Sequence, residues 1–137
     1  MKKVLSFIML SVFLVIGVHT SCQAAAAKVA VLPFKINAVE DLGFLRDGIQ
    51  DMLASRLAWD DKVVVIDKAI VNKAAASVTG FKGKNRALLI GAKLSADFVV
   101  YGSLTMIGEN ASIDAKVIDV EGKDEPTAIF KQTDTIG

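Results

Sequence analysis

The chain has 137 residues, of which 53% are hydrophobic and 7% aromatic, with 16 basic and 15 acidic side chains. This length fits a single domain, and the apolar content excludes an intrinsically disordered chain. The near-balance of charge leaves no clustered basic surface of the kind that nucleic-acid binding needs, so we expect no nucleic-acid partner.

Residues 1–27 are predicted to form a bacterial secretory signal peptide. Two lysines precede an apolar run over residues 4–18, and four alanines follow at residues 24–27. The run is shorter than the roughly 20 apolar residues that cross a membrane, and these three parts in this order are typical of an export signal. We therefore expect cleavage by residue 27 and a mature periplasmic domain over residues 28–137.

The only cysteine, Cys22, permits two interpretations. Ser21 fits the motif that precedes a lipidated cysteine, but His19 stands where such signals usually carry leucine. The favoured interpretation places Cys22 inside the removed peptide. In the alternative, Cys22 is lipidated and attaches the protein to a membrane. We expect contact with a membrane only in that case.

Cleavage of the signal peptide removes His19, the only histidine, and in the favoured interpretation Cys22 as well. The mature domain then loses most of the usual repertoire of nucleophiles, near-neutral bases and soft-metal ligands, because it has neither histidine nor cysteine. The sequence therefore predicts a protein that is not an enzyme and that carries no metal and no cofactor.

Hydropathy patterns predict an α/β fold with the order β-α-β-α-α-β-β-β. We expect strands over residues 28–34, 63–66, 96–107, 111–120 and 127–132, and helices over residues 42–58, 67–78 and 85–94. Asp41, Asp67 and Asn85 are the predicted N-caps of these helices. The run at 63–66 is continuously apolar, which is typical of a strand covered on both faces. Two crossovers followed by a meander imply one mixed sheet with the helices packed on one face.

Gly102 lies inside the longest predicted strand, where a glycine marks the close approach of another group. We favour a large residue of the first helix resting on Gly102. The alternative is an opening for a partner strand.

The loop before the third helix carries Lys82, Lys84 and Arg86. A phosphate-binding loop would need glycine at position 78 and serine or threonine at position 85, where Val78 and Asn85 stand. A solvated turn is therefore favoured. The alternative is an anion or nucleotide site at the start of the third helix, where free N–H groups favour negative charge.

Five segments resemble the TolB amino-terminal-like domain family of bacterial envelope proteins, which is related to the CsgG and FlgO domains and to lipoprotein activators of peptidoglycan synthases. The segments are Val29–Phe34, Phe44–Ile49, Phe81–Asn85, Ile90–Leu104 and Asp114–Asp119. Each motif is loose alone, but their order and spacing span residues 28–132. The resemblance implies a small α/β interaction module without catalytic residues. It also implies a C-terminally truncated domain, because the family's closing helix has no counterpart before Gly137.

The favoured function is a non-enzymatic, exported module of the bacterial envelope that binds a protein partner. The candidate surfaces are the sheet edge, marked by Lys131, and the polar sheet face that carries Ser112, Asp114 and Lys116. One alternative is binding of a small anion or nucleotide at Lys82, Lys84 and Arg86. Another is an outer-membrane lipoprotein of a secretion or flagellar assembly, and a third is an exported remnant without a partner.

Overall fold

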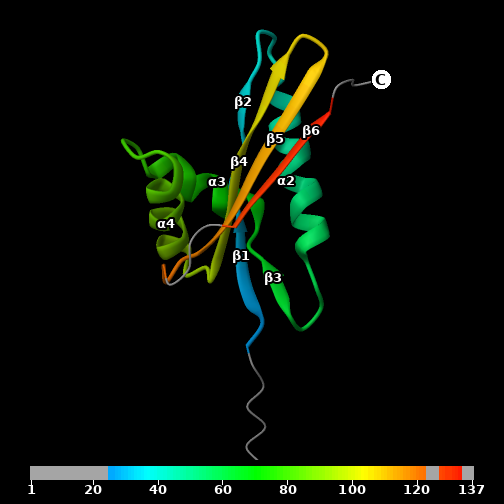
Figure 1. Ribbon diagram of the computed structural model, residues 1–137. Coiled ribbons are helices and arrows are strands. Elements are labelled where there is room, and N and C mark those ends of the chain that lie inside the picture. Colours follow the sequence, from blue (N-terminus) through cyan, green and yellow to red (C-terminus); the bar gives the residue numbers. More distant parts are fainter. Residues whose placement is uncertain (1–24, 123–126, 134–137) are drawn as a thin grey trace, which may run out of the picture.

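The computed structural model describes residues 25–122 and 127–133, so the predicted signal peptide and Cys22 lie outside the described residues. The described strands are β1 (Ala27–Val31), β2 (Lys35–Asn37), β3 (Val63–Val65), β4 (Phe98–Ile107), β5 (Asn110–Asp119) and β6 (Thr127–Thr133). The described helices are α2 (Gly43–Leu57), α3 (Lys68–Ser77) and α4 (Gly83–Leu94) (Figure 1). None of these helices combines the length and apolarity of a membrane span.

The six strands form one mixed sheet in the order β3-β1-β4-β5-β6, with β2 paired to β4. β1 pairs in parallel with β3 and β4, whereas β5 is antiparallel to both β4 and β6. The predicted fold class and element order are therefore confirmed, with β2 as an additional short strand. β2 resumes the pairing along β4 after a break at Leu32–Phe34, where Pro33 has no N–H to give to a ladder.

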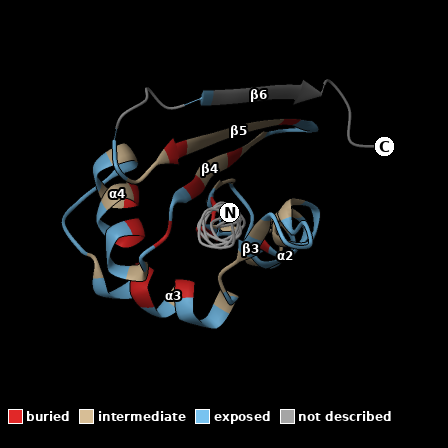
Figure 2. Cartoon of the chain, turned by 90° about the horizontal axis from the view of Figure 1, so that it is seen from below, coloured by how far each residue is buried: buried red, intermediate tan, exposed pale blue. Residues whose placement is uncertain are grey.

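Helices cover both faces of the sheet, with α3 and α4 on one side and α2 on the other (Figures 1 and 2). Successive residues of β1 show why. Ala30 belongs to a buried cluster with Ile90 of α4, whereas Val31 belongs to a second cluster with Leu53 of α2. Because neighbouring residues of a strand point to opposite faces, an apolar β1 needs cover on both sides. The prediction that the helices pack on one face is wrong for this reason.

The helix starts agree with the sequence in part. Asp67 is the N-cap of α3, and its Oδ1 accepts hydrogen bonds from the N–H groups of Ala69 at 2.8 Å and Ile70 at 3.3 Å, as predicted. Asn85 is not a cap, because α4 begins two residues earlier, after Lys82, without a side-chain capping bond. The N-cap of α2 is Leu42, one residue after the predicted Asp41. The carboxylate of Asp41 nevertheless accepts a hydrogen bond from Gly43 N–H at 3.1 Å.

β3 is an edge strand, and the prediction that it is covered on both faces is wrong, because the face that carries Val64 is open to solvent. Val64 is 53% exposed. At the first residue of β3, the outer side is occupied by a tight turn in which Trp59 and Val63 exchange backbone hydrogen bonds of 3.2 and 2.8 Å. Lys62 Nζ lies 4.1 Å from the centroid of the Trp59 ring, a cation–π distance. The turn thus occupies the outward peptide groups of Val63, the first residue of β3.

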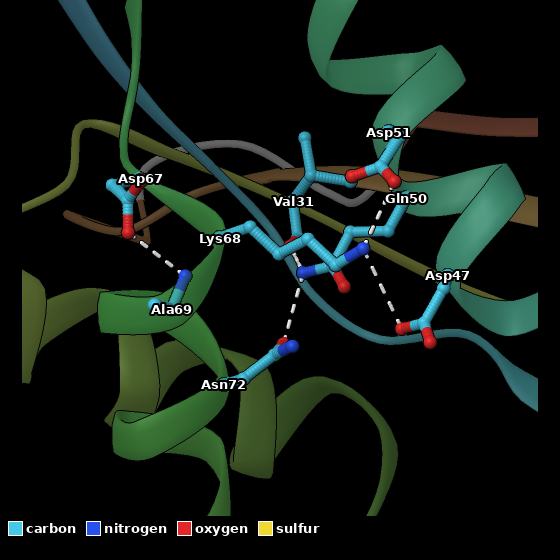
Figure 3. A network of polar contacts seen from close by, with 8 residues as sticks. All are labelled: Val31, Asp47, Gln50, Asp51, Asp67, Lys68, Ala69 and Asn72. Atoms are coloured by element: carbon cyan, nitrogen blue, oxygen red, sulfur yellow. Dashed lines mark hydrogen bonds and ion pairs between the residues drawn. The ribbon is translucent and has the colours of Figure 1, made fainter.

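A polar network joins α2 to α3 beyond the end of β3 (Figure 3). Gln50 Nε2 donates hydrogen bonds to Val31 O at 2.8 Å and to Asn72 Oδ1 at 3.0 Å. Lys68 Nζ lies 2.9 Å from Asp51 Oδ2 and also approaches Asp47 on the same helix, at 3.6 Å. These contacts hold together two helices that cover opposite faces of the sheet.

Candidate functional site

A cavity of about 590 Å³ opens between the first turn of α4 and the sheet face under it. Its walls come from the segment after β1, from β2, from the loop before α4, and from the middle of β4 and β5. Most of its charged side chains are basic: Lys35, Lys82, Arg86 and Lys116, with Asp114 as the acid. We call it the basic cavity.

The polar face of β5 forms the floor of the basic cavity. Asp114 pairs with Ser103 and Lys116 with Tyr101 across the β4–β5 ladder, and all four side chains line the cavity. They share one face because residues two apart on a strand point the same way. Ser112, the third residue predicted for this face, is half-buried and does not line the cavity.

The basic loop forms the opposite wall. Lys82 and Arg86 line the cavity, whereas Lys84 does not. Arg86 donates hydrogen bonds to Ala75 O at 2.7 Å and Val78 O at 3.3 Å. These bonds satisfy carbonyl groups at the C-terminal end of α3 and fix the start of α4 against it. The structure therefore brings together two surfaces that the sequence analysis treated as separate sites.

Three charged or polar residues of the cavity were not predicted as site residues from the sequence: Lys35, Tyr101 and Ser103. Lys35 lies on β2, which was not predicted as a strand. Tyr101 lines the floor, and burial, with a smaller contribution from the charge of Asp114, raises its pKa above 10.0. Lys116 Nζ lies 3.8 Å from Asp114 Oδ2. Within the described part of the chain, no group of three acidic, cysteine or histidine side chains is placed to hold a metal ion.

Gly102 lines the cavity, at the level where the chain between β1 and β2 runs alongside β4. A β-carbon at Gly102 would meet the carbonyl oxygen of Asp114 and lie 2.7 Å from Phe34 Cε1. The predicted close approach is confirmed. The large residue is Phe34, however, and not a residue of the first helix.

The edge strand β6 pairs with β5, and no described strand pairs with its outer side. Val120 N–H donates to Asp97 O at 2.9 Å, so even-numbered residues of β5 bond to β4 and odd-numbered residues bond to β6. Lys131 faces Ile113, and its N–H therefore points toward β5. The peptide groups that point outward are those of Ala128, Phe130 and Gln132.

No known family model matches the sequence, and no curated protein matches it. Solved structures do match. The C-terminal domain of LpoB from Escherichia coli is 14% identical, with a TM-score of 0.60 over 88% of this chain and 90% of that chain. The lipoprotein GNA1162 from Neisseria meningitidis is 19% identical, with a TM-score of 0.56 over 78% of this chain and 81% of that chain. TolB from Acinetobacter baumannii is 15% identical, with a TM-score of 0.50 over 77% of this chain but 22% of its own length.

Identities this low establish a shared fold and leave function open. The sequence resemblance to the TolB amino-terminal-like domain family is thus supported by three-dimensional structure. The chain has the fold that is shared by the LpoB C-terminal domain, GNA1162 and part of TolB.

Proposed function

We propose that this chain is a non-enzymatic, exported module of the cell envelope that binds a protein partner by adding a strand of that partner to β6. The observation that carries the proposal is a difference in backbone pairing between the two edge strands of the sheet, β3 and β6. At the β3 edge, the turn at Trp59 pairs with the outward peptide groups of Val63, whereas no described strand pairs with the outward peptide groups of Ala128, Phe130 and Gln132 on β6. Unpaired edge groups are a template for strand addition.

Beyond the end of β3, a side chain binds one backbone carbonyl on the same side of β1. Val29 O accepts a hydrogen bond from Ile66 N–H at 2.9 Å, and the next carbonyl on that side, Val31 O, accepts from Gln50. The chain therefore provides donors for two successive carbonyl groups on this side of β1, the second of them beyond the end of β3. An edge left open in the same sheet is consistent with an intermolecular role.

The likeness to LpoB, GNA1162 and TolB supports the envelope as the setting, since GNA1162 is a lipoprotein. Export through residues 1–27 follows from the sequence pattern. Intact mass of the mature protein tests both forms of the proposal. A mass that begins at residues 25–28 in the soluble fraction supports a free periplasmic module. A mass with an acylated Cys22 supports the outer-membrane lipoprotein instead. An unprocessed chain that begins at Met1 would contradict export.

Ala128→Pro tests the edge. Proline removes the outward N–H without removing a bond to β5, and edge positions of this kind tolerate it. We expect about tenfold weaker capture of the partner from envelope extracts of the source cells, equivalent to about 1.4 kcal/mol for one backbone bond and the steric block. Ala128→Gly, which keeps the N–H, is the matched control. Equal capture by Ala128→Pro and Ala128→Gly, with both folded by circular dichroism, would contradict strand addition.

A further inference from the structure

We propose that the basic cavity binds a small organic anion in which a phosphate or carboxylate group is joined to an apolar ring. This site is separate from the β6 edge and does not depend on a protein partner. Three properties of the cavity lead to it: its size, its excess of positive charge and its aromatic side chains.

The size of the cavity fits a small molecule. Ligand sites commonly enclose about 300 to 1,000 Å³, and the basic cavity has about 590 Å³. Its walls come from elements that are rigidly connected: Arg86 ties α4 to the end of α3, and the floor is the β4–β5 ladder. The cavity is therefore formed before any ligand binds.

The cavity is more positively charged than the chain as a whole. Four basic side chains and one acid give the lining a formal charge of +3, whereas the whole chain has a net charge of +1. Neither Lys35 nor Lys82 has an acid within salt-bridge distance in the described part of the chain. Like charges held around one concavity raise the local concentration of anions.

The first turn of α4 adds to this positive potential. It contains no acidic residue, and its N-cap, Lys82, makes no side-chain capping bond. Its N–H groups carry the partial positive charge of a helix start. A ligand oxyanion at this end of the cavity would be attracted by lysine side chains and backbone together.

The apolar part of the ligand is indicated by Phe81 and Tyr101. Phe81 is 52% exposed at the cavity wall, and Tyr101 lines the floor. An aromatic ring that covers exposed Phe81 removes apolar surface from water and stacks favourably on another ring. Inorganic phosphate alone would leave this surface exposed, so the ring and the anion are both part of the proposal.

The test uses phenyl phosphate, which combines ring and charge, with inorganic phosphate and phenol as the two halves. Binding is followed by calorimetry and by backbone NMR shifts of the uniformly labelled protein. We expect phenyl phosphate to bind at least about tenfold more tightly than either half, with shifts at Lys82, Gly83 and Lys116. Absence of phenyl phosphate binding at about 10 mM, weaker than any useful affinity, would overturn the proposal.

Charge variants locate the site. Lys82→Ala combined with Lys116→Ala should weaken phenyl phosphate binding about tenfold, because two charges that attract the phosphate are removed. Asp114→Asn should strengthen binding about threefold, because a charge that repels the phosphate is removed. Arg56→Ala combined with Lys73→Ala, which removes the same charge elsewhere, is the matched control. An equal loss in the control pair, or no loss in Lys82→Ala with Lys116→Ala, would overturn the assignment to this cavity. Ala128→Pro should bind phenyl phosphate normally, which separates this proposal from partner binding at β6.

Discussion

Gln50 Nε2 donates a 2.8 Å hydrogen bond to the backbone carbonyl of Val31, at a point of β1 beyond its pairing with β3 (Figure 3). Gln50 is 1% exposed, and it is the only buried polar or charged residue found in the described part of the chain. The side-chain amide thus replaces a backbone donor that the three-residue strand β3 is too short to supply. Its second bond, to Asn72 Oδ1, connects the helices on the two faces.

Gln50→Ala should lower the free energy of unfolding by about 2 to 4 kcal/mol. The substitution leaves the buried Val31 carbonyl without a donor, which costs about 1 to 3 kcal/mol, and it adds the cost of a small cavity. Met52→Ala, at an exposed position of the same helix, should change stability by less than about 1 kcal/mol. Urea unfolding followed by circular dichroism measures both. Equal effects of the two substitutions would show that Gln50 does not seal the edge of β1.

Gly102→Ala should lower the free energy of unfolding by about 1 to 3 kcal/mol, because a β-carbon there overlaps the Asp114 carbonyl and Phe34. Gly48→Ala is the matched control. Gly48 lies inside α2, and nothing lies within 4 Å of its β-carbon position. Alanine should therefore stabilise the helix by about 0.5 to 1 kcal/mol. Thermal unfolding of the two variants should give shifts of opposite sign, and a stabilised Gly102→Ala protein would contradict the packing of Phe34 on β4.

Tyr101 is the only tyrosine in the chain, so the ultraviolet absorbance of phenolate titrates this one group. We expect its pKa to lie above 10.0 in the folded protein, mainly because burial disfavours the charged form. Asp114→Asn should lower the pKa of Tyr101 only in part, since burial remains. A bound anion should raise it further. Ionisation at the ordinary pKa in the folded protein would contradict this placement of Tyr101.

The same shift has a consequence for stability at high pH. A pKa raised in the folded state gives a contribution that is fully present below the unfolded pKa of about 10 and is lost as the pH rises through the folded pKa. The hydrogen bond from Lys68 to Asp51 raises the pKa of Lys68 and acts in the same direction. The free energy of unfolding should therefore fall as the pH rises above about 10. Tyr101→Phe should reduce that fall, because phenylalanine has no proton to lose.

The local sequence predicted most of the elements. The hydropathy pattern predicted the first helix, and Asp67 predicted the start of the second. The side of the sheet that each helix covers was predicted wrongly, although every position from 29 to 32, in β1 and directly after it, is apolar. That pattern already implied burial on both faces. The pairing of Trp59 with Val63 depends on a turn that no periodicity reveals.

The basic cavity could not be predicted because its two halves are distant in sequence. Lys82 and Lys116 were each identified as candidate residues, but their meeting depends on α4 crossing the β4–β5 face. One part could have been found. The two-residue turn at Gly108–Glu109 fixes the hairpin register, and counting back from it places Tyr101 opposite Lys116. Lys35 gave no comparable signal, because the strand that carries it is only three residues long.

Residue-resolved amide hydrogen exchange on β6 tests the central claim most directly. In the isolated chain, the outward amides of Ala128, Phe130 and Gln132 should exchange faster than the inward amides of Ile129 and Lys131, which bond to β5. In complex with the captured partner, the outward amides should become protected, with exchange slowed about tenfold or more. Unchanged exchange at these outward amides in a saturated complex, with new protection elsewhere on the chain, would contradict strand addition at β6.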